Sequence, residues 1–235
     1  MRQIVASQSF ARSPRVTRQF PMNHPATPTR GERTRACIVA CASALFWQRS
    51  FHAVSVDQVA EAAEVNKATV YRYFADKRDL AGAVVRHNGV MTLELIFRAS
   101  FSDYDAPQDR LAAIYRAAFM THSQMHASNG DMYGCPIVGL SLELGQEMPE
   151  VREEASRIFD EVERYFTAIA QQAVAARRRA DDPAALGRTL TQLMHGANAS
   201  SRLAVDAGRV LDAGRASLAL IGFPDTPIFP KEPSR

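Results

Sequence analysis

From Gly31 onward, the apolar residues of this chain recur at the three- and four-residue spacing that places side chains on one face of an α-helix. Four prolines precede such stretches, namely Pro107, Pro136, Pro149 and Pro183. Proline suits the first turn of a helix, because the N–H that it lacks would have no partner there. No segment alternates apolar and polar residues as a half-buried strand does. The pattern predicts an all-α fold.

Composition narrows the class of protein further. Hydrophobic residues make up 46% of the 235 residues and charged residues 23%, as in ordinary globular proteins. No apolar run approaches the roughly 18–20 residues that a membrane-spanning helix needs. Three cysteines are an odd number and do not indicate a disulfide framework. We therefore expect a cytoplasmic protein without a membrane partner.

The charge is unevenly distributed along the chain. Residues 1–90 carry 13 basic and 6 acidic side chains, a net charge of +7. Residues 91–235 carry 15 basic and 19 acidic side chains, a net charge of −4. A basic front part indicates contact with a polyanion such as DNA, although a solvated, uneven surface would give the same counts.

Residues 1–29 contain four prolines and four arginines, no acidic residue and no helical periodicity, which predicts a disordered basic arm. An organellar transit peptide has a similar composition, and Met22 is a second candidate start of the chain. We expect a helix-turn-helix domain over residues 30–76, a helical ligand-binding and dimerisation domain over 77–224, and a tail over 225–235.

Helix-start signals follow one another closely in the front part. Ser55 and Gln58 form a capping-box pattern, and Asn66 and Asp76 are good N-caps for the two helices that follow. The last of these is a long segment at about 77–101. Two further amphipathic helices are expected at about 149–176 and 183–204, with apolar faces wide enough to pair with a second copy as a four-helix bundle.

The short helices before residue 76 have the order of a helix-turn-helix. Apolar residues can lock the two helices together, and these are Val59, Ala63, Val65, Val70 and Phe74. This arrangement leaves Lys67, Ala68, Tyr71 and Arg72 on the outward face of the second helix. Such a helix fits the DNA major groove, where basic side chains donate to guanine and methyl groups contact thymine.

Here the sequence resembles the TetR family of transcriptional regulators, over about residues 31–85. The resemblance rests on the segment from Arg33-Thr-Arg to Leu80, with Tyr71-Arg-Tyr-Phe74 and the following Lys77. It implies a dimeric, cytosolic, all-α repressor that a ligand releases from a DNA operator. It also implies Lys67, Ala68, Thr69 and Arg72 as base readers and Tyr71 and Lys77 as phosphate contacts. Arg35, in the basic stretch before the first helix, could reach an adjacent phosphate or the minor groove, or belong to a solvated arm. Ser55 completes the predicted DNA-binding set.

Two positions depart from the family pattern. The family usually has glycine where this chain has Glu64, in the turn, and again where it has Ser50. If Glu64 takes a positive φ, the backbone conformation costs about 1 kcal/mol.

Beyond residue 100 only the chemistry of the side chains guides prediction. Large apolar residues and one histidine predict an effector cavity, namely Phe97, Phe101, Tyr115, Phe119, His122, Phe159 and Met194. Each of the large apolar residues serves equally well as plain core.

Cys135 precedes a proline-initiated helix, where the helix dipole lowers a thiol pKa, so a thiol-based electrophile or redox sensor is the alternative function. A buried, inert cysteine is the simpler interpretation. Cys37 and Cys41 are expected in the core of the first helix.

Other classes of function lack their signatures. His122 and His126 are spaced to chelate a metal from one helix face, but no acidic or cysteine partner follows, so we expect no metal and no cofactor. A di-iron bundle enzyme needs Glu-x-x-His pairs, which the chain does not contain, and no phosphate loop is present. The large apolar back half argues against an architectural DNA protein. We therefore expect a DNA-binding regulator and not an enzyme.

Overall fold

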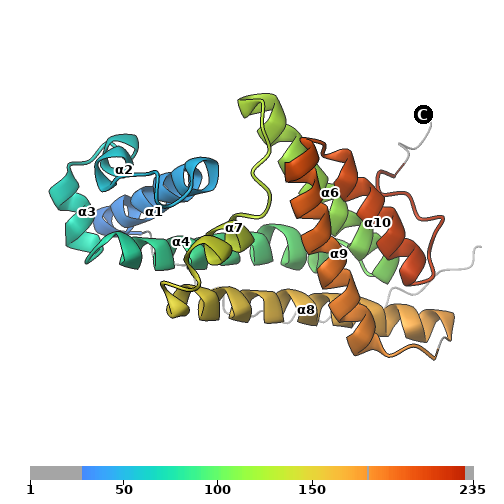
Figure 1. Cartoon of the computed structure of the whole chain (residues 1–235). Helices are drawn as coiled ribbons and strands as arrows, with labels where there is room; N and C mark the ends of the chain where they lie inside the picture. Colours follow the sequence, from blue (N-terminus) through green and yellow to red (C-terminus); the bar gives the residue numbers. More distant parts are fainter. Residues whose placement is uncertain (1–27, 179, 231–235) are drawn as a thin grey trace, which may run out of the picture.

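The computed structural model describes residues 28–178 and 180–230, and every regular element within these ranges is a helix (Figure 1). The all-α prediction is confirmed for this part of the chain. The predicted arm lies outside the described residues except for its last two positions. None of the described helices has the length and apolarity to cross a membrane.

The first three helices form a small head, which lies at the left of Figure 1. They are α1 (Arg30–Arg49), α2 (Val56–Ala62) and α3 (Lys67–Tyr73). Ser55 and Gln58 make the predicted capping box of α2, and the Asn66 side chain accepts from the N–H of Thr69 at the start of α3. The head packs around a core that includes Ile38, Val59, Val70 and Phe74.

A long helical segment connects the head to the rest of the molecule. It begins as α4 (Lys77–Thr92), capped by Asp76 as predicted, and continues through η1 (Leu93–Arg98) into α5 (Ala99–Asp103). The long helical segment expected at about 77–101 is therefore present, and η1 is a π-helical stretch within it. Such π-segments are frequent at functional sites, because they re-aim side chains along a helix.

The back half consists of α6 (Pro107–Asn129), α7 (Pro136–Leu144), α8 (Pro149–Arg177), α9 (Pro183–Ala204) and α10 (Gly208–Leu220). All four predicted prolines stand in the first turn of their helices. Helix α8 runs beside α4, while α6, α9 and α10 form an upright group at the other end of the molecule (Figure 1). Tyr115, Leu190 and Leu218 are fully buried in this group, and Phe166 of α8 is fully buried against it.

Two turns of the head hold non-glycine residues at positive φ. Glu64 has φ 53° in the turn between α2 and α3, the positive φ considered from the sequence. Ser50 ends α1 with φ 79° and ψ 156°, a region that is essentially restricted to glycine. Both residues stand where the resemblance places glycine, so the head carries backbone strain at each of its two connections.

We predict that Ser50→Gly raises the free energy of unfolding by about 1–2 kcal/mol, because glycine relieves more strain at this φ and ψ than it loses in chain entropy. Glu64→Gly should raise the free energy of unfolding by about 1 kcal/mol or less. Urea denaturation of the purified variants measures both values. Ser50→Ala is the matched control, since it keeps the β-carbon and therefore the strain. A Ser50→Gly protein no more stable than Ser50→Ala would contradict this account.

Candidate functional site

Helix α3 presents a polar face at the end of the molecule that is remote from α9 and α10 (Figure 1). Lys67, Ala68, Tyr71 and Arg72 are exposed on it, and Val70, on the opposite side of the helix, is buried. Tyr71 is a large side chain left 46% exposed. The local sequence produces this arrangement, because Asn66 fixes the start of α3 and Val70 anchors it to the head core.

The remaining residues of the predicted DNA-binding set surround α3. Thr69 is half-buried, and both its N–H and its hydroxyl donate to Oδ1 of Asn66. The guanidinium of Arg35 lies 5.0 Å from the centre of the Phe74 ring. Ser55 is exposed, and its hydroxyl oxygen accepts the Gln58 N–H. These contacts are local, and the joint role of the residues in DNA binding stays a prediction.

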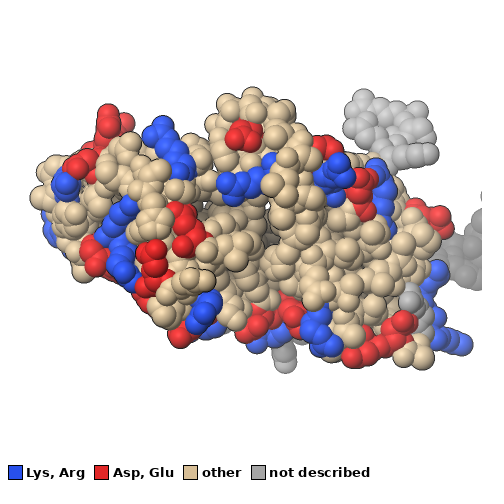
Figure 2. Space-filling view, viewed as in Figure 1, with Lys and Arg blue, Asp and Glu red and all other residues tan. Residues whose placement is uncertain are grey.

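The basic side chains at this end of the head differ in their surroundings. The Lys67 ammonium donates to Asp57 at 2.8 Å, and this hydrogen bond raises the pKa of Lys67. Arg72 and Arg30 line a polar depression of about 600 Å³ between α1 and α3. Figure 2 shows basic and acidic side chains interspersed over the head on the visible face. Glu64 lines the same depression, so the depression carries charges of both signs.

Lys77 has a structural partner that the sequence did not indicate. Its ammonium donates to the backbone oxygen of Phe51 at 2.5 Å and lies 4.1 Å from the centre of the Phe51 ring. Burial lowers the pKa of Lys77. Lys77 therefore ties the start of α4 to the turn between α1 and α2, and its predicted role as a phosphate contact stays a prediction.

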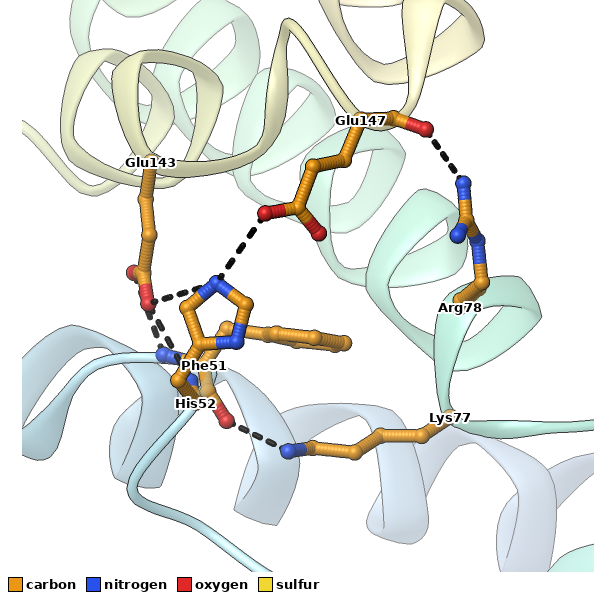
Figure 3. Close-up of polar contacts among 6 residues, drawn as sticks. All are labelled: Phe51, His52, Lys77, Arg78, Glu143 and Glu147. Carbon is orange, nitrogen blue, oxygen red and sulfur yellow. Dashed lines mark hydrogen bonds and ion pairs between the residues drawn. The ribbon is translucent and has the colours of Figure 1, made fainter.

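Helix α7 binds the same turn from the other side (Figure 3). The Glu143 carboxylate accepts the N–H groups of Phe51 and His52, each at 3.1 Å. The His52 Nε2 atom lies 3.9 Å from carboxylate oxygens of both Glu143 and Glu147, and Arg78 of α4 donates to the backbone oxygen of Glu147. We call this set, with Lys77, the junction. It joins the head to α7 and α4 through backbone groups of the turn.

A second contact joins the head to the loop before α7. The indole Nε1 of Trp47, on α1, donates to the backbone oxygen of Gly134 at 3.0 Å. The Trp47 ring also packs edge-on against Tyr133, with 6.1 Å between ring centres. Neither Trp47 nor Glu143 was singled out from the sequence, because each acts on a partner about 90 residues away and leaves no local pattern.

Trp47 borders a cavity of about 150 Å³ between the head and the back half. Three of the predicted effector residues line it, namely Phe97, His122 and Met194, and so does Cys135. Residues of the π-segment and of α4 contribute as well, so the irregular part of the long helix borders the cavity. A dry cavity of this volume binds benzene in another protein, which makes it large enough for a small aromatic molecule.

The other predicted effector residues lie outside this cavity. Tyr115 is fully buried, donates to or accepts from Ser217 at 2.7 Å, and has its pKa raised to about 12 by burial. Phe101 packs on Tyr165, Phe119 on Phe229 and Phe159 on His195. These four pack against neighbouring rings and helices, the alternative that the sequence left open for each of them.

The cysteines differ in part from expectation. Burial raises the pKa of Cys135, and the N–H groups of Val138 and Ile137 only partly offset this effect, so the predicted lowering by the helix dipole does not prevail. Cys37 is exposed, which corrects its placement in the core, and the Cys41 thiol donates to the Ala62 oxygen at 3.3 Å. Among the described residues, no three His, Cys, Asp or Glu side chains are placed to hold a metal.

Two family models match the chain and together cover more than half of it. Residues 38–84 match the bacterial regulatory proteins of the tetR family, and residues 107–217 match the tetracyclin repressor-like C-terminal domain. The first match contains the whole helix-turn-helix, and the second runs from the start of α6 into α10.

Curated relatives match over part of the chain. The chain is 34% identical over 76 residues to the HTH-type transcriptional repressor Rv3405c of Mycobacterium tuberculosis. The aligned segment covers 32% of this chain and 40% of that protein. The chain is also 42% identical over 48 residues to the uncharacterized HTH-type transcriptional regulator YdeS of Bacillus subtilis. This aligned segment covers 20% of this chain and 24% of YdeS. The match thus spans less than half the length of these relatives.

Solved structures share the whole fold. Reduced NemR of E. coli matches with a TM-score of 0.66 and 21% identity, over 82% of this chain and 100% of that chain. The TetR-family regulator SCO4454 of Streptomyces coelicolor matches with a TM-score of 0.67 and 22% identity, over 82% and 96% of the two chains. At these identities the likeness shows the fold alone.

We predict that Arg72→Ala relaxes base preference at one position of each half-site. Binding to the preferred base at that position should weaken by about 1–3 kcal/mol. Tyr71→Ala should instead weaken all sequences alike, because a phosphate contact carries no base information. Selection from random DNA followed by affinity measurements distinguishes the two effects. Arg157→Ala, an exposed arginine of α8, is the control. Unchanged affinity and preference in both α3 variants would exclude α3 as the reading helix.

Proposed function

Because this chain belongs to the TetR family of DNA-binding transcriptional regulators, we propose that it represses transcription from a palindromic operator and that a small apolar or aromatic effector releases it. The cavity bordered by Trp47 is the observation that carries this proposal. A molecule bound in this cavity would contact Trp47 of α1, the first helix of the DNA-binding head. We further infer a cytoplasmic location, where the operator is found.

A palindromic operator requires two copies of the head. Helix α3 is seven residues long and contacts too few bases to select a site in a genome by itself. Two copies related by a two-fold axis would read two half-sites, one in each of two successive major grooves. The proposed active form is therefore a homodimer whose symmetry matches that of its operator.

The surface of α9 is the better candidate for the dimer contact. Its exposed side carries Gly196, Ala199 and Leu203, and Leu203 is 87% exposed. The exposed side of α8, which the sequence also indicated for pairing, carries charged pairs such as Arg157 with Glu154. Apolar exposed side chains gain from burial against a second copy, whereas charged ones lose hydration. We therefore propose that α9 forms the centre of the interface.

We predict that Leu203→Glu yields monomers at micromolar concentration, because it places a charge in the proposed apolar contact. The monomers should lose operator binding while keeping their helical content. Sedimentation velocity measures the first effect and circular dichroism checks the second. Gln171→Glu, which adds a charge to the exposed side of α8, should remain dimeric. A Leu203→Glu dimer that binds operator normally would refute this interface.

The junction offers a route from the cavity to the head. A molecule in the cavity contacts Trp47 directly and also the segment from Gly134 to Pro136, which leads into α7. Helix α7 ends near Glu143, which binds the turn between α1 and α2. A shift of α7 would therefore tilt the head and change the separation of the two α3 helices. A coupling of about 1–3 kcal/mol would change operator affinity about 5- to 150-fold.

A thiol-based sensor remains the second candidate function. Cys135 lines the same cavity, and a solved neighbour of similar fold is described in a reduced form. The raised pKa of Cys135 disfavours it, because the thiolate is the reactive species and burial keeps the thiol protonated at neutral pH. We therefore propose non-covalent binding as the means of release.

We predict that toluene weakens operator binding by the wild-type protein, and that Glu143→Ala reduces this effect to less than about twofold because α7 no longer holds the turn. Cys135→Ser should keep the full response, since no covalent step is involved. Fluorescence anisotropy of a genomic fragment selected by the protein measures operator affinity. A Glu143→Ala protein that binds toluene and keeps the wild-type response would contradict the route. An electrophile such as N-ethylmaleimide that weakens operator binding by the wild-type protein but not by Cys135→Ser would favour the thiol function.

A further inference from the structure

We propose that Cys37 and Cys41 form a dithiol site for an organic arsenic(III) compound, located in the DNA-binding head. The site goes beyond the proposed function, because it lies on α1 and shares no residue with the cavity bordered by Trp47. Three features carry the inference: the spacing of the two thiols, their access to solvent, and the contact that one of them makes with the end of α2.

The spacing of the two thiols suits a bridging atom. Cys37 and Cys41 stand four residues apart on α1, so both side chains lie on one side of the helix. Burial raises the pKa of Cys41 and the neighbouring Cys37 thiol raises it further, so the two groups interact. The β-carbons of such a pair are about 5–6 Å apart, whereas a disulfide needs about 3.5–4.5 Å. One atom with two bonds to sulfur, of about 2.3 Å each as for zinc, spans sulfurs up to about 4.6 Å apart.

The surroundings of the pair select the class of bridging atom. Both thiols are free, with Cys37 exposed and Cys41 half-buried, so a reagent reaches them from solvent. Among the described residues, no third His, Cys, Asp or Glu completes a metal-binding group with them. Structural zinc sites have four ligands, so the pair does not suit zinc. A trivalent arsenic atom with one carbon substituent forms two bonds to sulfur and needs no other ligand from the protein.

The binding reaction is an exchange of bonds without oxidation. In water, phenylarsine oxide takes up one water molecule and becomes an acid with two As–OH groups. The Sγ atoms of Cys37 and Cys41 each form one As–S bond, both As–OH bonds break, and each thiol proton leaves with a hydroxyl group as water. Arsenic stays trivalent. A metal cation would instead have to displace both protons, which the raised pKa of Cys41 opposes.

The Cys41 thiol connects this site to the helix-turn-helix. It donates to the backbone oxygen of Ala62, the last residue of α2, at 3.3 Å. Carbonyl groups at the end of a helix lack partners within the helix, and no backbone N–H of the described residues donates to this one. Glu64, two residues further on, holds the turn at positive φ. An As–S bond replaces the thiol proton and removes this hydrogen bond, which loosens the turn that leads into α3.

Binding is tested with phenylarsine oxide on the full-length protein, reduced with a phosphine that carries no thiol. Native mass spectrometry should show one phenylarsenic group on each chain, and competition with a small dithiol measures the affinity. Cys37→Ser and Cys41→Ala should each lower this affinity by about 100-fold or more, because the second bond to the same chain forms at high effective concentration. Cys135→Ser keeps both thiols of α1 and is the matched control, which should bind as the wild type does.

Operator binding tests the consequence for the turn, by fluorescence anisotropy of a genomic fragment selected by the protein. Phenylarsine oxide should weaken operator binding by the wild type and by Cys135→Ser about 2- to 12-fold, the range that one lost hydrogen bond supplies. Cys37→Ser should not respond, because it cannot form the bridge. Cys41→Ala lacks the contact with Ala62, so its operator binding should be weakened already and should not change further.

Equal affinities of the wild type and Cys37→Ser for phenylarsine oxide would overturn the dithiol site, and so would loss of binding in Cys135→Ser. Zinc binding as tight as that of phenylarsine oxide would overturn the assignment to arsenic. Unchanged operator affinity of the fully occupied wild type would overturn the link to the turn. The response to toluene involves neither thiol of α1 and is measured separately, so failure of the proposed function is distinguished from failure of this site.

Discussion

The proposed communication between the two halves of the molecule depends on the Glu143 carboxylate. It accepts two adjacent backbone N–H groups of the turn between α1 and α2, from a helix that begins at the cavity. A side chain that binds backbone groups moves the main chain when it moves. The turn also contains Ser50 at φ 79°, a conformation held only because its surroundings determine it. Lys77 of α4 donates to the backbone oxygen of Phe51 in the same turn, so α4 and α7, which both border the cavity, also both contact this turn.

Helix α1 contacts both the cavity and the surroundings of α3. Trp47 stands near the end of that helix and borders the cavity, and Arg30 at its start lines the depression beside α3. A ligand therefore needs no long pathway to reach the DNA-binding head. The π-segment at Leu93–Arg98 borders the same cavity, which gives the long connecting helix an irregular point where its direction can change.

The helices could be predicted from local sequence signals, whereas the tertiary contacts could not. Ser55, Asn66, Asp76 and the helix-initiating prolines act within a few residues of where they stand, so the sequence located these helix starts correctly. Trp47 and Glu143 act across about 90 residues, and nothing near them marks that role.

The helical spacing of apolar residues also could not distinguish residues that line the cavity from residues of the core. Phe97 and Tyr115 look alike in the sequence, yet Phe97 borders the cavity and Tyr115 packs in the core against Ser217. The π-segment shifts the register of the long helix, which a uniform helical repeat does not anticipate. The most direct test of the central claim is reciprocity, measured by calorimetry of toluene binding with and without saturating operator DNA. The account predicts that operator weakens toluene binding by the same factor by which toluene weakens operator binding. Identical toluene affinities in the two titrations would contradict it.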